Sequence, residues 1–426
     1  MPNGKQTLEN VCVMGLGYIG LPTSSLLATK GFKVHGVDNN PAVVEAINSG
    51  KTLITEPDLD ILVKSAVNSG NLVAGLEPVP ADVFILAVPT PFKEGHAPDI
   101  SYVEAATRSI APHLVPGNLV ILESTSPVGT TEKIGGWLQE LRPDLTLPSR
   151  KSYETYANHD ETIIFLAHCP ERVLPGQILK ELIDNDRVIG GLNQAAAEKA
   201  QAFYQKFVQG DILLTDVRTA ELCKLVENSF RDVNIAFANE LSLICDQLDI
   251  NVWKLISLAN RHPRVNILQP GPGVGGHCIA VDPWFIVSSA PDKARIIVTA
   301  RVVNDSKPNF VLAKIKEKAA RFKDPVIACL GLSYKADIDD LRESPAVEIV
   351  HKLASEQKGR ILVVEPHISD LPAPLAAFAN LEFTDLGTAL KHADILAFLV
   401  NHRAFGRVDR ELLKEKVVID TAGIWR

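Results

Sequence analysis

Hydrophobic residues in the first two hundred positions gather in short, almost continuous runs, with segments of helical spacing between them. The runs lie at 11–15, 33–38, 82–89, 118–124 and 162–168. The helical segments include 19–30, 101–113 and 130–141. Strands that are apolar on both faces suit a parallel sheet covered by helices on both sides. The pattern therefore predicts a doubly wound α/β domain over residues 1–210, with a long loop at 142–160.

The pattern changes after Asp216, where a stretch without glycine or proline begins and runs from 217 to 250. Its apolar residues recur at helical spacing. They are Leu222, Leu225, Val226, Phe230, Val233, Phe237, Leu241, Ile244 and Leu248. At about 1.5 Å per residue this helix would be roughly 50 Å long, more than one ordinary domain needs internally. We therefore expect a central helical domain, 211–304, whose long helix joins two domains and packs against a second subunit.

The α/β alternation resumes after Asn304. Further apolar strands lie at 325–334, 360–366, 394–400 and 417–423. The predicted fold class is α/β, with doubly wound domains at 1–210 and 305–426 joined by a long central helix.

Composition narrows the class of protein. Hydrophobic residues make up 46% and charged residues 22% of the chain, and the net charge is −8, so the chain as a whole attracts neither nucleic acid nor an anionic membrane. The first ten residues lack an apolar signal region, and the longest apolar runs are strand-sized. The six cysteines form no C-x-x-C pair and no metal-finger spacing. We expect a reduced, cytoplasmic enzyme with no metal, nucleic-acid or membrane partner.

Gly15, Gly17 and Gly20 form G-x-G-x-x-G directly after the first strand and at the start of a helix. Asp38 ends the next strand, eighteen positions after Gly20. This context predicts a dinucleotide site, in which the pyrophosphate rests on the helix N-terminus and the acid binds the ribose 2′-hydroxyl. The residues after Asp38 offer no arginine or lysine for a 2′-phosphate, so NAD is favoured over NADP.

Hydroxyl side chains follow two more strands of this domain. Thr90 ends one strand, and Ser124 and Thr125 end another. Ligands bind at the carboxyl ends of strands in open α/β sheets, so these residues are candidates for the same crevice. Ordinary turn and helix-cap roles explain such hydroxyls equally well.

Two charged stretches have a functional and a plainer interpretation. Along the long helix, polar residues at helical spacing share one face, which is either part of a site or a solvated face with a Glu221–Lys224 pair. They are Glu221, Lys224, Asn228 and Arg231. Further on, Arg261, His262 and Arg264 form either a ligand-binding group or a basic surface loop.

Cys278 follows a glycine-rich loop, and Asp282 comes four residues later. Glycines let the backbone approach a ligand closely. A metal site is disfavoured because, apart from the adjacent His277, no cysteine or histidine lies at ligand spacing. A catalytic thiol beside a bound NAD is the sharper hypothesis, because thiolates attack aldehydes and the adduct can then lose a hydride.

The loop after the strand at 325–334 carries Lys335 and Arg342. Both suit a phosphate, although a charged loop at a helix start is an equally good interpretation.

Together these stretches resemble the UDP-glucose/GDP-mannose dehydrogenase family over essentially the whole chain. The resemblance is closest to members that oxidise UDP-N-acetyl-D-mannosamine. It rests on "GLGYIGLP", "VPTP", "ESTSPVGTT", "HCPERVLPG", "AELCKLVENSFRDVNIAFANELSLIC", "GPGVGGHCIAVDP", "YKADIDDLRESPA" and the terminal "GIWR".

The resemblance implies two Rossmann-like domains, a homodimer built on the central helices, and NAD-dependent four-electron oxidation of a nucleotide sugar's C6 alcohol to a carboxylate. It makes Cys278 the nucleophile and Lys224 the acid/base or oxyanion-stabilising group. The other implied catalytic residues are Asn228, Asp282, Thr125 and Glu171. Those implied to bind NAD are Gly15, Gly17, Tyr18, Ile19, Gly20, Asp38, Thr90, Thr125 and Arg342. Those implied to bind the UDP-sugar are Arg172, Val173, Lys224, Asn228, Arg231, His262, Arg264, Gly275, Tyr334 and Lys335. Arg264 is the candidate to reach the partner subunit's site.

One departure from the UDP-glucose members bears on the sugar. After Pro170-Glu171 they carry an aromatic residue and a second glutamate, whereas this chain has Arg172 and Val173. The change is consistent with an N-acetylated sugar, and it leaves the role of Glu171 as a base open. UDP-N-acetylglucosamine is the alternative substrate. A non-catalytic protein that senses NAD or a nucleotide sugar is the alternative of another class.

The uncharged residues after Asp38 predict a preference for NAD, because nothing there neutralises a 2′-phosphate. The ratio of kcat/KM for NAD to that for NADP should be well above one. Comparable values for the two cofactors would contradict the assignment.

Overall fold

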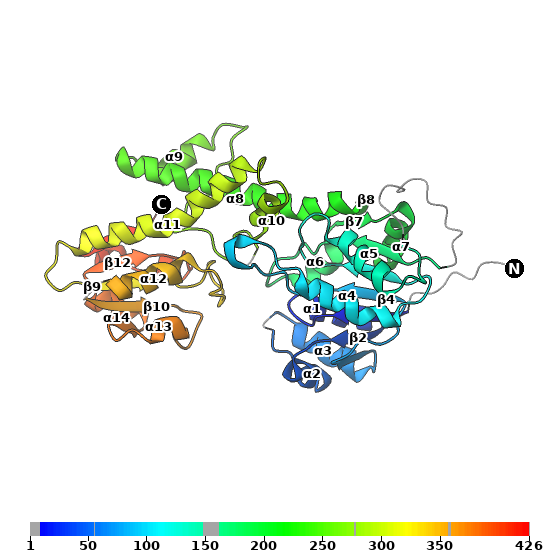
Figure 1. The fold of residues 1–426 in the computed structure, drawn as a ribbon. Helices are drawn as coiled ribbons and strands as arrows, with labels where there is room; N and C mark the ends of the chain where they lie inside the picture. The colour runs from blue at the N-terminus through cyan, green and yellow to red at the C-terminus, as the bar shows by residue number, and fades with distance from the viewer. Residues whose placement is uncertain (1–8, 55, 148–161, 277, 357–358, 426) are drawn as a thin grey trace. The chain divides into compact units, whose positions relative to one another are not determined.

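The computed structural model describes residues 9–54, 56–147, 162–276, 278–356 and 359–425 (Figure 1). Most of the predicted loop at 142–160 lies outside these ranges. The chain divides into two compact units. The first contains the residues up to Val226 together with Trp284–Ser289, and the second contains Glu227–Pro283 and the residues from Ala290 onward.

The first unit is built on an eight-stranded sheet with the strand order β3-β2-β1-β4-β5-β6-β7-β8. Neighbouring strands pair in parallel, except for the antiparallel pair β6 and β7. The strands are β1 (Asn10–Met14), β2 (Lys33–Val37), β3 (Leu72–Gly75), β4 (Val83–Leu86), β5 (Leu119–Leu122), β6 (Phe165–His168), β7 (Arg187–Gly191) and β8 (Ile212–Asp216).

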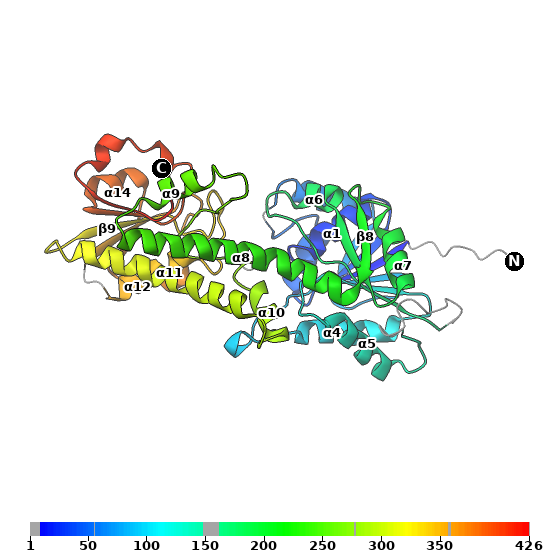
Figure 2. The same ribbon diagram turned by 90° about the horizontal axis from the view of Figure 1, so that it is seen from above.

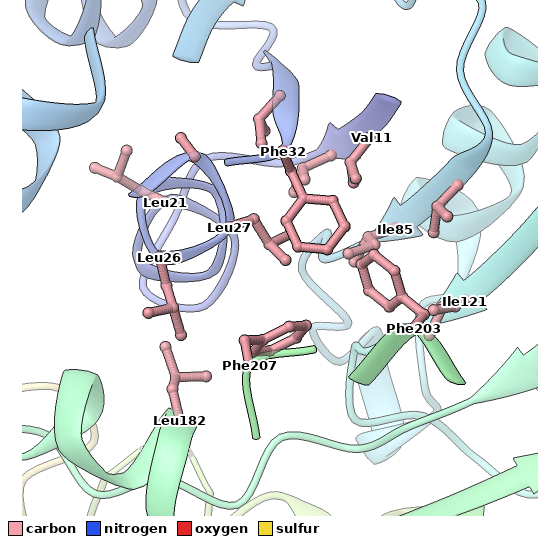
Figure 3. Close-up of a cluster of buried hydrophobic side chains, with 14 of the residues drawn as sticks. Val11, Leu21, Leu26, Leu27, Phe32, Ile85, Ile121, Leu182, Phe203 and Phe207 are labelled. Atoms are coloured by element: carbon pink, nitrogen blue, oxygen red, sulfur yellow. The ribbon is translucent and has the colours of Figure 1, made fainter. Parts of the chain in front are cut away.

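Helices cover both faces of this sheet. They are α1 (Gly20–Thr29), α2 (Pro41–Asn48), α3 (Leu59–Asn68), α4 (Ser101–Ile110), α5 (Thr130–Leu141), α6 (Ile178–Asp184) and α7 (Gln194–Tyr204). One core packs α1, α3, α6 and α7 against the sheet, and the other packs α4 and α5. In the first core the ring of Phe203 meets those of Phe32 and Phe207 edge-on, at centroid distances of 5.4 and 5.7 Å (Figure 3).

The predicted helix at 217–250 is present as α8 (Val217–Gln247), and most of it lies in the second unit. There α11 (Arg295–Ala319) runs alongside it (Figure 2). Arg301 of α11 donates to Asp232 at 2.6 Å, and both side chains are buried. Asn239 donates to Asn304 at 2.8 Å. Two further helices of this region are α9 (Val252–Ala259) and α10 (Asp282–Ser289).

The second unit ends in a five-stranded parallel sheet with the order β11-β10-β9-β12-β13. The strands are β9 (Val326–Leu330), β10 (Arg360–Val364), β11 (Leu381–Phe383), β12 (Ile395–Phe398) and β13 (Val417–Asp420). The helices are α12 (Pro345–Glu356), α13 (Ala373–Ala376) and α14 (Leu386–His392). Helices α11 and α12 pack on one face and α14 on the other. The strand order reverses at β9, so the loops after β9, β10 and β12 meet at the edge where such sheets bind ligands.

These observations confirm the predicted α/β class and its two doubly wound sheets. The predicted boundary between 210 and 211 falls just before β8, which hydrogen-bonds to β7 as part of the large sheet. The boundary predicted between 304 and 305 falls inside α11. Among the described residues, no helix is both long and apolar enough to cross a membrane.

Candidate active site

The turn between β1 and α1 has the geometry of a phosphate cradle. Gly15 has φ +93°, and a Cβ there would lie 2.6 Å from the Ala87 carbonyl oxygen. A Cβ on Gly20 would lie 1.8 Å from the carbonyl oxygen of Gly15. In contrast, a Cβ on Gly17 would meet no atom of the described chain within 4 Å. The first and third glycines therefore permit the tight turn, and the second leaves the space a pyrophosphate needs.

Asp38 lies beside this turn at the end of β2. Its carboxylate accepts from the Leu16 N–H at 3.0 Å and from the Asn40 N–H at 2.9 Å. Ile19, the N-cap residue of α1, makes no side-chain cap bond, and the positive end of the helix dipole at this turn favours an anion. Tyr18 is exposed on the same turn. These residues fit NAD, which supplies the hydride acceptor when bound.

The hydroxyls at the neighbouring strand ends bond to backbone. Thr90 Oγ1 donates to the Thr125 carbonyl oxygen at 2.6 Å, and Ser124 Oγ donates to that of Val88 at 2.7 Å. Thr90 and Thr125 are thus brought together, and the Thr125 side chain is half-buried. The bonds fix the loops after β4 and β5 relative to each other.

Glu171 is buried in an ion pair. Its Oε2 accepts from Arg187 at 2.6 Å, and its Oε1 accepts from the Arg172 N–H at 2.8 Å. Arg172 itself is half-buried, and its guanidinium donates to the Asp186 carbonyl oxygen at 3.3 Å. This arrangement favours a role for Glu171 in positioning Arg172 over a role as base. The next residue, Val173, packs at the edge of the core.

A second buried acid, Glu123, accepts from the Tyr204 hydroxyl at 2.6 Å. Burial, reinforced by the negative charge of Glu171, raises the pKa of Glu123 to about 7, although Arg187 and the Tyr204 bond oppose the shift. Glu123 directly precedes Ser124 and Thr125, so an acid whose pKa is raised to about 7 lies next in sequence to the two candidate crevice residues of this strand end.

Glu221 contradicts the plainer interpretation of the long helix as a solvated face with a Glu221–Lys224 pair. It is buried, and its carboxylate accepts from the Gly129 N–H at 2.6 Å and from the Thr131 N–H and hydroxyl at 2.8 and 2.7 Å. These groups begin α5, so the acid caps that helix and complements its dipole. Lys224, one turn further along α8, is half-buried.

In the second unit the structure joins Asn228 to Asp282. The Asn228 amide nitrogen donates to Asp282 Oδ2 at 2.5 Å, and both side chains are buried. The Asp282 N–H donates to the Cys278 carbonyl oxygen at 2.8 Å. The Cys278 side chain itself is partly exposed. Thus a reachable thiol sits one turn from a buried carboxylate whose orientation an amide fixes.

The glycine loop before Cys278 packs on the loop after β9. A Cβ on Gly275 would lie 2.5 Å from the Glu343 carbonyl oxygen, and one on Gly276 would lie 2.8 Å from the ring of Tyr334. The Gly276 N–H donates to the Arg342 carbonyl oxygen at 3.2 Å. The Arg342 side chain forms an ion pair with Asp340 at 2.6 Å. The structure thus gathers Gly275, Tyr334 and the Arg342 backbone around the thiol loop.

The remaining predicted substrate residues are exposed and lie in the second unit. They are Arg231, His262, Arg264 and Lys335. His262 Nδ1 accepts from the Arg264 N–H at 3.3 Å, which orients the ring within its turn. Their exposure suits ligand contacts and equally suits the basic surface loop.

Comparison with known proteins assigns the chain. Its residues 9–208, 218–306 and 328–426 match the NAD binding, central and UDP binding domains of the UDP-glucose/GDP-mannose dehydrogenase family. The chain belongs to this family. The predicted NAD cofactor and the NAD-dependent dehydrogenase class are thereby confirmed.

Two curated members and one solved structure illustrate the similarity. The chain is 59% identical to a UDP-N-acetyl-D-mannosamine dehydrogenase of Campylobacter jejuni, over 95% of this chain and 98% of that one. It is 58% identical to an NDP-N-acetyl-D-galactosaminuronic acid dehydrogenase of Ralstonia nicotianae, over 98% and 96%. The solved UDP-N-acetyl-mannosamine dehydrogenase of Staphylococcus aureus superposes with a TM-score of 0.85 at 41% identity, covering 98% of this chain and 95% of that chain.

Sequence reasoning did not single out Glu123, and it named Glu221 only as a member of a polar helix face, without predicting that it is buried and caps α5. A carboxylate among apolar residues at a strand end, as in Glu123-Ser124-Thr125, was the available signal for the first. For Glu221 the signal was weaker, because helical spacing shows which residues share a face but not which face is buried.

The raised pKa of Glu123 predicts a specific pH dependence of stability. The folded protein keeps a proton that the unfolded chain, with a pKa near 4.5, releases, so stability falls as pH rises from about 4.5 through about 7. Glu123→Gln resembles the protonated acid and does not ionise. The variant should match wild type in thermal unfolding near pH 5 and exceed it by several degrees at pH 8, a gain on the order of 3 kcal/mol.

Glu140→Gln, at an exposed position of α5, is the matched control. Its unfolding temperature should change between pH 5 and pH 8 by the same amount as that of wild type. An equal effect of Glu123→Gln at both pH values would contradict the assignment.

Proposed function

We propose that the chain oxidises the C6 alcohol of a UDP-N-acetylhexosamine to the carboxylate, and that UDP-N-acetyl-D-mannosamine is its preferred substrate. The observation that carries the proposal is the partly exposed Cys278 on a glycine loop, one turn from the buried Asn228–Asp282 pair. A two-electron alcohol dehydrogenase needs no such thiol. Arg172 and Val173, where UDP-glucose members have an aromatic residue and a glutamate, support an N-acetylated sugar.

The thiol is proposed to serve the second oxidation. Removal of a hydride and a proton from the alcohol gives an aldehyde, to whose carbon the Cys278 sulfur adds. The thiohemiacetal formed in this way loses a second hydride and its hydroxyl proton, leaving a thioester. Water then cleaves the thioester to the carboxylate and returns the thiol. Because the sugar stays bonded to Cys278, the aldehyde is not released.

Three side chains are proposed to assist. Lys224 places positive charge near the oxygen that becomes anionic, an effect worth about 3–4 kcal/mol for comparable donors. Asp282 accepts a proton, and the amide of Asn228 holds its carboxylate in one orientation. Lys224 and Asn228 lie one turn apart on α8, so the same helix face carries both.

The substrate assignment is tested by a panel of UDP-N-acetylmannosamine, UDP-N-acetylglucosamine, UDP-N-acetylgalactosamine, UDP-glucose and GDP-mannose, with NADH formation as the signal. The mannosamine derivative should give the highest kcat/KM. The similarity to the galactosaminuronic acid dehydrogenase makes the galactosamine derivative the second candidate. Equal or better turnover of UDP-glucose would overturn the assignment to an N-acetylated sugar. NAD binding without oxidation of any of the sugars would favour a sensor.

The covalent route predicts two NADH per sugar in the wild-type enzyme. Cys278→Ala should form no acid at an appreciable rate. Its fold and NAD affinity should survive, because one small side chain on a loop contributes little packing. Cys223→Ser, at the other partly exposed cysteine, should retain the stoichiometry of two. Near-native acid formation by Cys278→Ala would reject the mechanism.

We also propose a homodimer built on α8. Large apolar side chains are exposed along this helix in the single chain, among them Phe230 at 67% and Phe237 at 54%. The others are Leu222, Val226 and Ile244, and Leu248 directly after the helix is exposed too. Leu225, predicted on the same stripe, is buried within the chain instead. A continuous apolar stripe of this length favours a second helix of the same kind as its cover. Arg264 remains the candidate to reach the partner subunit's site.

Light scattering at micromolar concentration should give a dimer. Phe230→Glu should give a folded monomer, because the side chain is exposed in the single chain and its charge would be buried in the dimer. Leu412→Glu, which alters an exposed apolar residue elsewhere, should stay dimeric. If the wild-type protein is a monomer under these conditions, the proposed dimer is rejected, and so is the proposed role of Arg264 in the partner subunit's site.

A further inference from the structure

The loop after β9 is anchored by a buried acid that no motif pointed to. Glu365, directly after β10, has no exposed side-chain surface. Its Oε2 accepts from the N–H groups of Leu332 and Ser333 at 2.7 and 3.0 Å, and its Oε1 accepts from the His367 N–H at 3.1 Å. Burial alone would raise the pKa of Glu365, but the bonds from His402 and the loop outweigh it and hold the pKa below its usual value. The first residues of the loop after β9 are therefore held by hydrogen bonds to the Glu365 carboxylate.

His402, after β12, ties the same acid to the middle of the loop. Its Nδ1 accepts from the Asp337 N–H at 2.9 Å, which leaves the ring proton on Nε2. Nε2 lies 3.1 Å from Glu365 Oε2 and donates to it. The fully buried ring thus links Glu365 to Asp337 in the middle of the loop after β9. Three strand ends at the switch point of the sheet hold the segment that carries Tyr334 and Lys335.

A metal ion is the other use such a cluster could have. Ligand atoms of Asp337, His367 and His402 lie within 4.8 Å of one another. However, both ring nitrogens of His402 already form the hydrogen bonds described above, and Asp337 is paired with Arg403 at 2.8 Å. Metal binding would break the bonds that hold the loop, so the geometry favours positioning.

The anchored loop after β9 in turn forms the surface on which the glycine loop before Cys278 packs, here called its seat. The Tyr334 ring occupies the space that a side chain at Gly276 would need, and the Tyr334 Cβ lies 2.8 Å from where a Cβ on Gly275 would be. Gly276 has φ +82°. The Gly276 N–H donates to the Arg342 carbonyl oxygen, at the far end of the anchored loop. Cys278 follows two residues after Gly276, so a shift of the Tyr334 ring changes where the thiol lies.

We propose that Glu365 and His402 are positioning residues for Cys278, which act through Tyr334 and the glycine loop. The loop that carries the predicted nucleotide contacts and the loop that carries the thiol then move as one body. The inference rests on the proposed role of Cys278 as nucleophile. Its advantage is that the thiol is held in reacting geometry before the aldehyde forms, since small misplacements of a reacting group are costly in rate.

The test is the rate at which iodoacetamide alkylates Cys278 without any ligand, resolved by mass spectrometry of peptides. Tyr334→Ala removes the seat, Glu365→Gln weakens the anchor, and His402→Leu removes the bridge. Each should raise the alkylation rate of Cys278 at least fivefold, because the loop is released. His402→Gln, which keeps an N–H donor toward Glu365, should lie closer to wild type. Cys223, partly exposed on α8, is the reference in the same sample.

His351→Gln is the matched control, because His351 is exposed on α12 and packs against Phe378 instead of this loop. It should leave the alkylation rate of Cys278 unchanged.

Alkylation rates of Cys278 in Tyr334→Ala and Glu365→Gln within twofold of the wild-type rate would overturn the proposal. An increase in the alkylation rate of Cys223 by the same factor as that of Cys278 would overturn the proposal too, because the substitution would then have destabilised the whole fold. Tyr334→Ala leaves the buried anchor intact and keeps the test informative if a buried variant fails to fold.

Turnover gives a second readout. In Glu365→Gln, kcat for sugar oxidation should fall at least tenfold while the KM for NAD stays within twofold, because the cofactor residues at the β1–α1 turn belong to the first unit. If the wild-type enzyme oxidises no UDP-sugar but alkylation responds as expected, the proposed function fails and the positioning stands. If the enzyme turns over and alkylation does not respond, only the positioning fails.

Discussion

The contact between the glycine loop and Tyr334 is the constraint on which the second unit's chemistry depends. A Cβ on Gly275 or Gly276 would come within 3 Å of this neighbouring segment, so only glycine allows the approach. Cys278 lies two positions after Gly276 in the sequence. In the first turn of α10 the Asp282 N–H donates to the Cys278 carbonyl oxygen, and the Asp282 carboxylate accepts from Asn228. On the proposed positioning, this one close contact determines the place of the thiol and of its nearest buried acid.

Buried carboxylates perform a related task elsewhere in the molecule. Glu221 holds the start of α5, Glu171 holds the Arg172 backbone, and Glu365 holds the loop after β9. Arg172 is itself a predicted substrate residue, and Ser333, whose N–H bonds to Glu365, directly precedes Tyr334. Hydrogen bonds to a charged group contribute about 1.5–3 kcal/mol each, and an unpaired buried charge is costly. Glu171 and Glu365 thus fix segments that have no regular structure of their own, and Glu221 fixes the first turn of a helix.

The sequence predicted the elements better than their tertiary roles. Buried strands such as β4 could be predicted because every residue is apolar. Edge strands such as β3, where Val73 is half exposed, contain no continuous apolar run and were not predicted. The glycine turn of the NAD domain could be predicted because all its glycines lie within one short stretch between a strand and a helix. Long helix α11 was not predicted, because it mixes charged residues with its apolar positions and contains Pro308.

The site was predicted in part, and mostly through family resemblance. Asn228 and Asp282 lie 54 positions apart, and no spacing rule joins them. Glu365 and His402 were missed altogether, because a single acid and a single histidine 37 positions apart give no local signature. Their signal was positional: Glu365 directly follows β10 and His402 lies four residues after the end of β12, and residues at the carboxyl ends of parallel strands converge at one edge. Only the fold makes that convergence visible.

The central claim is that Cys278 carries the sugar between the two oxidations. The most direct measurement quenches the enzyme with acid during steady turnover of its best UDP-sugar and determines the mass of the peptide that contains Cys278. The account predicts an added acyl group of the uronyl nucleotide on this residue, formed together with NADH and lost when the substrate is exhausted. Steady production of two NADH per sugar with Cys278 unmodified throughout would contradict it.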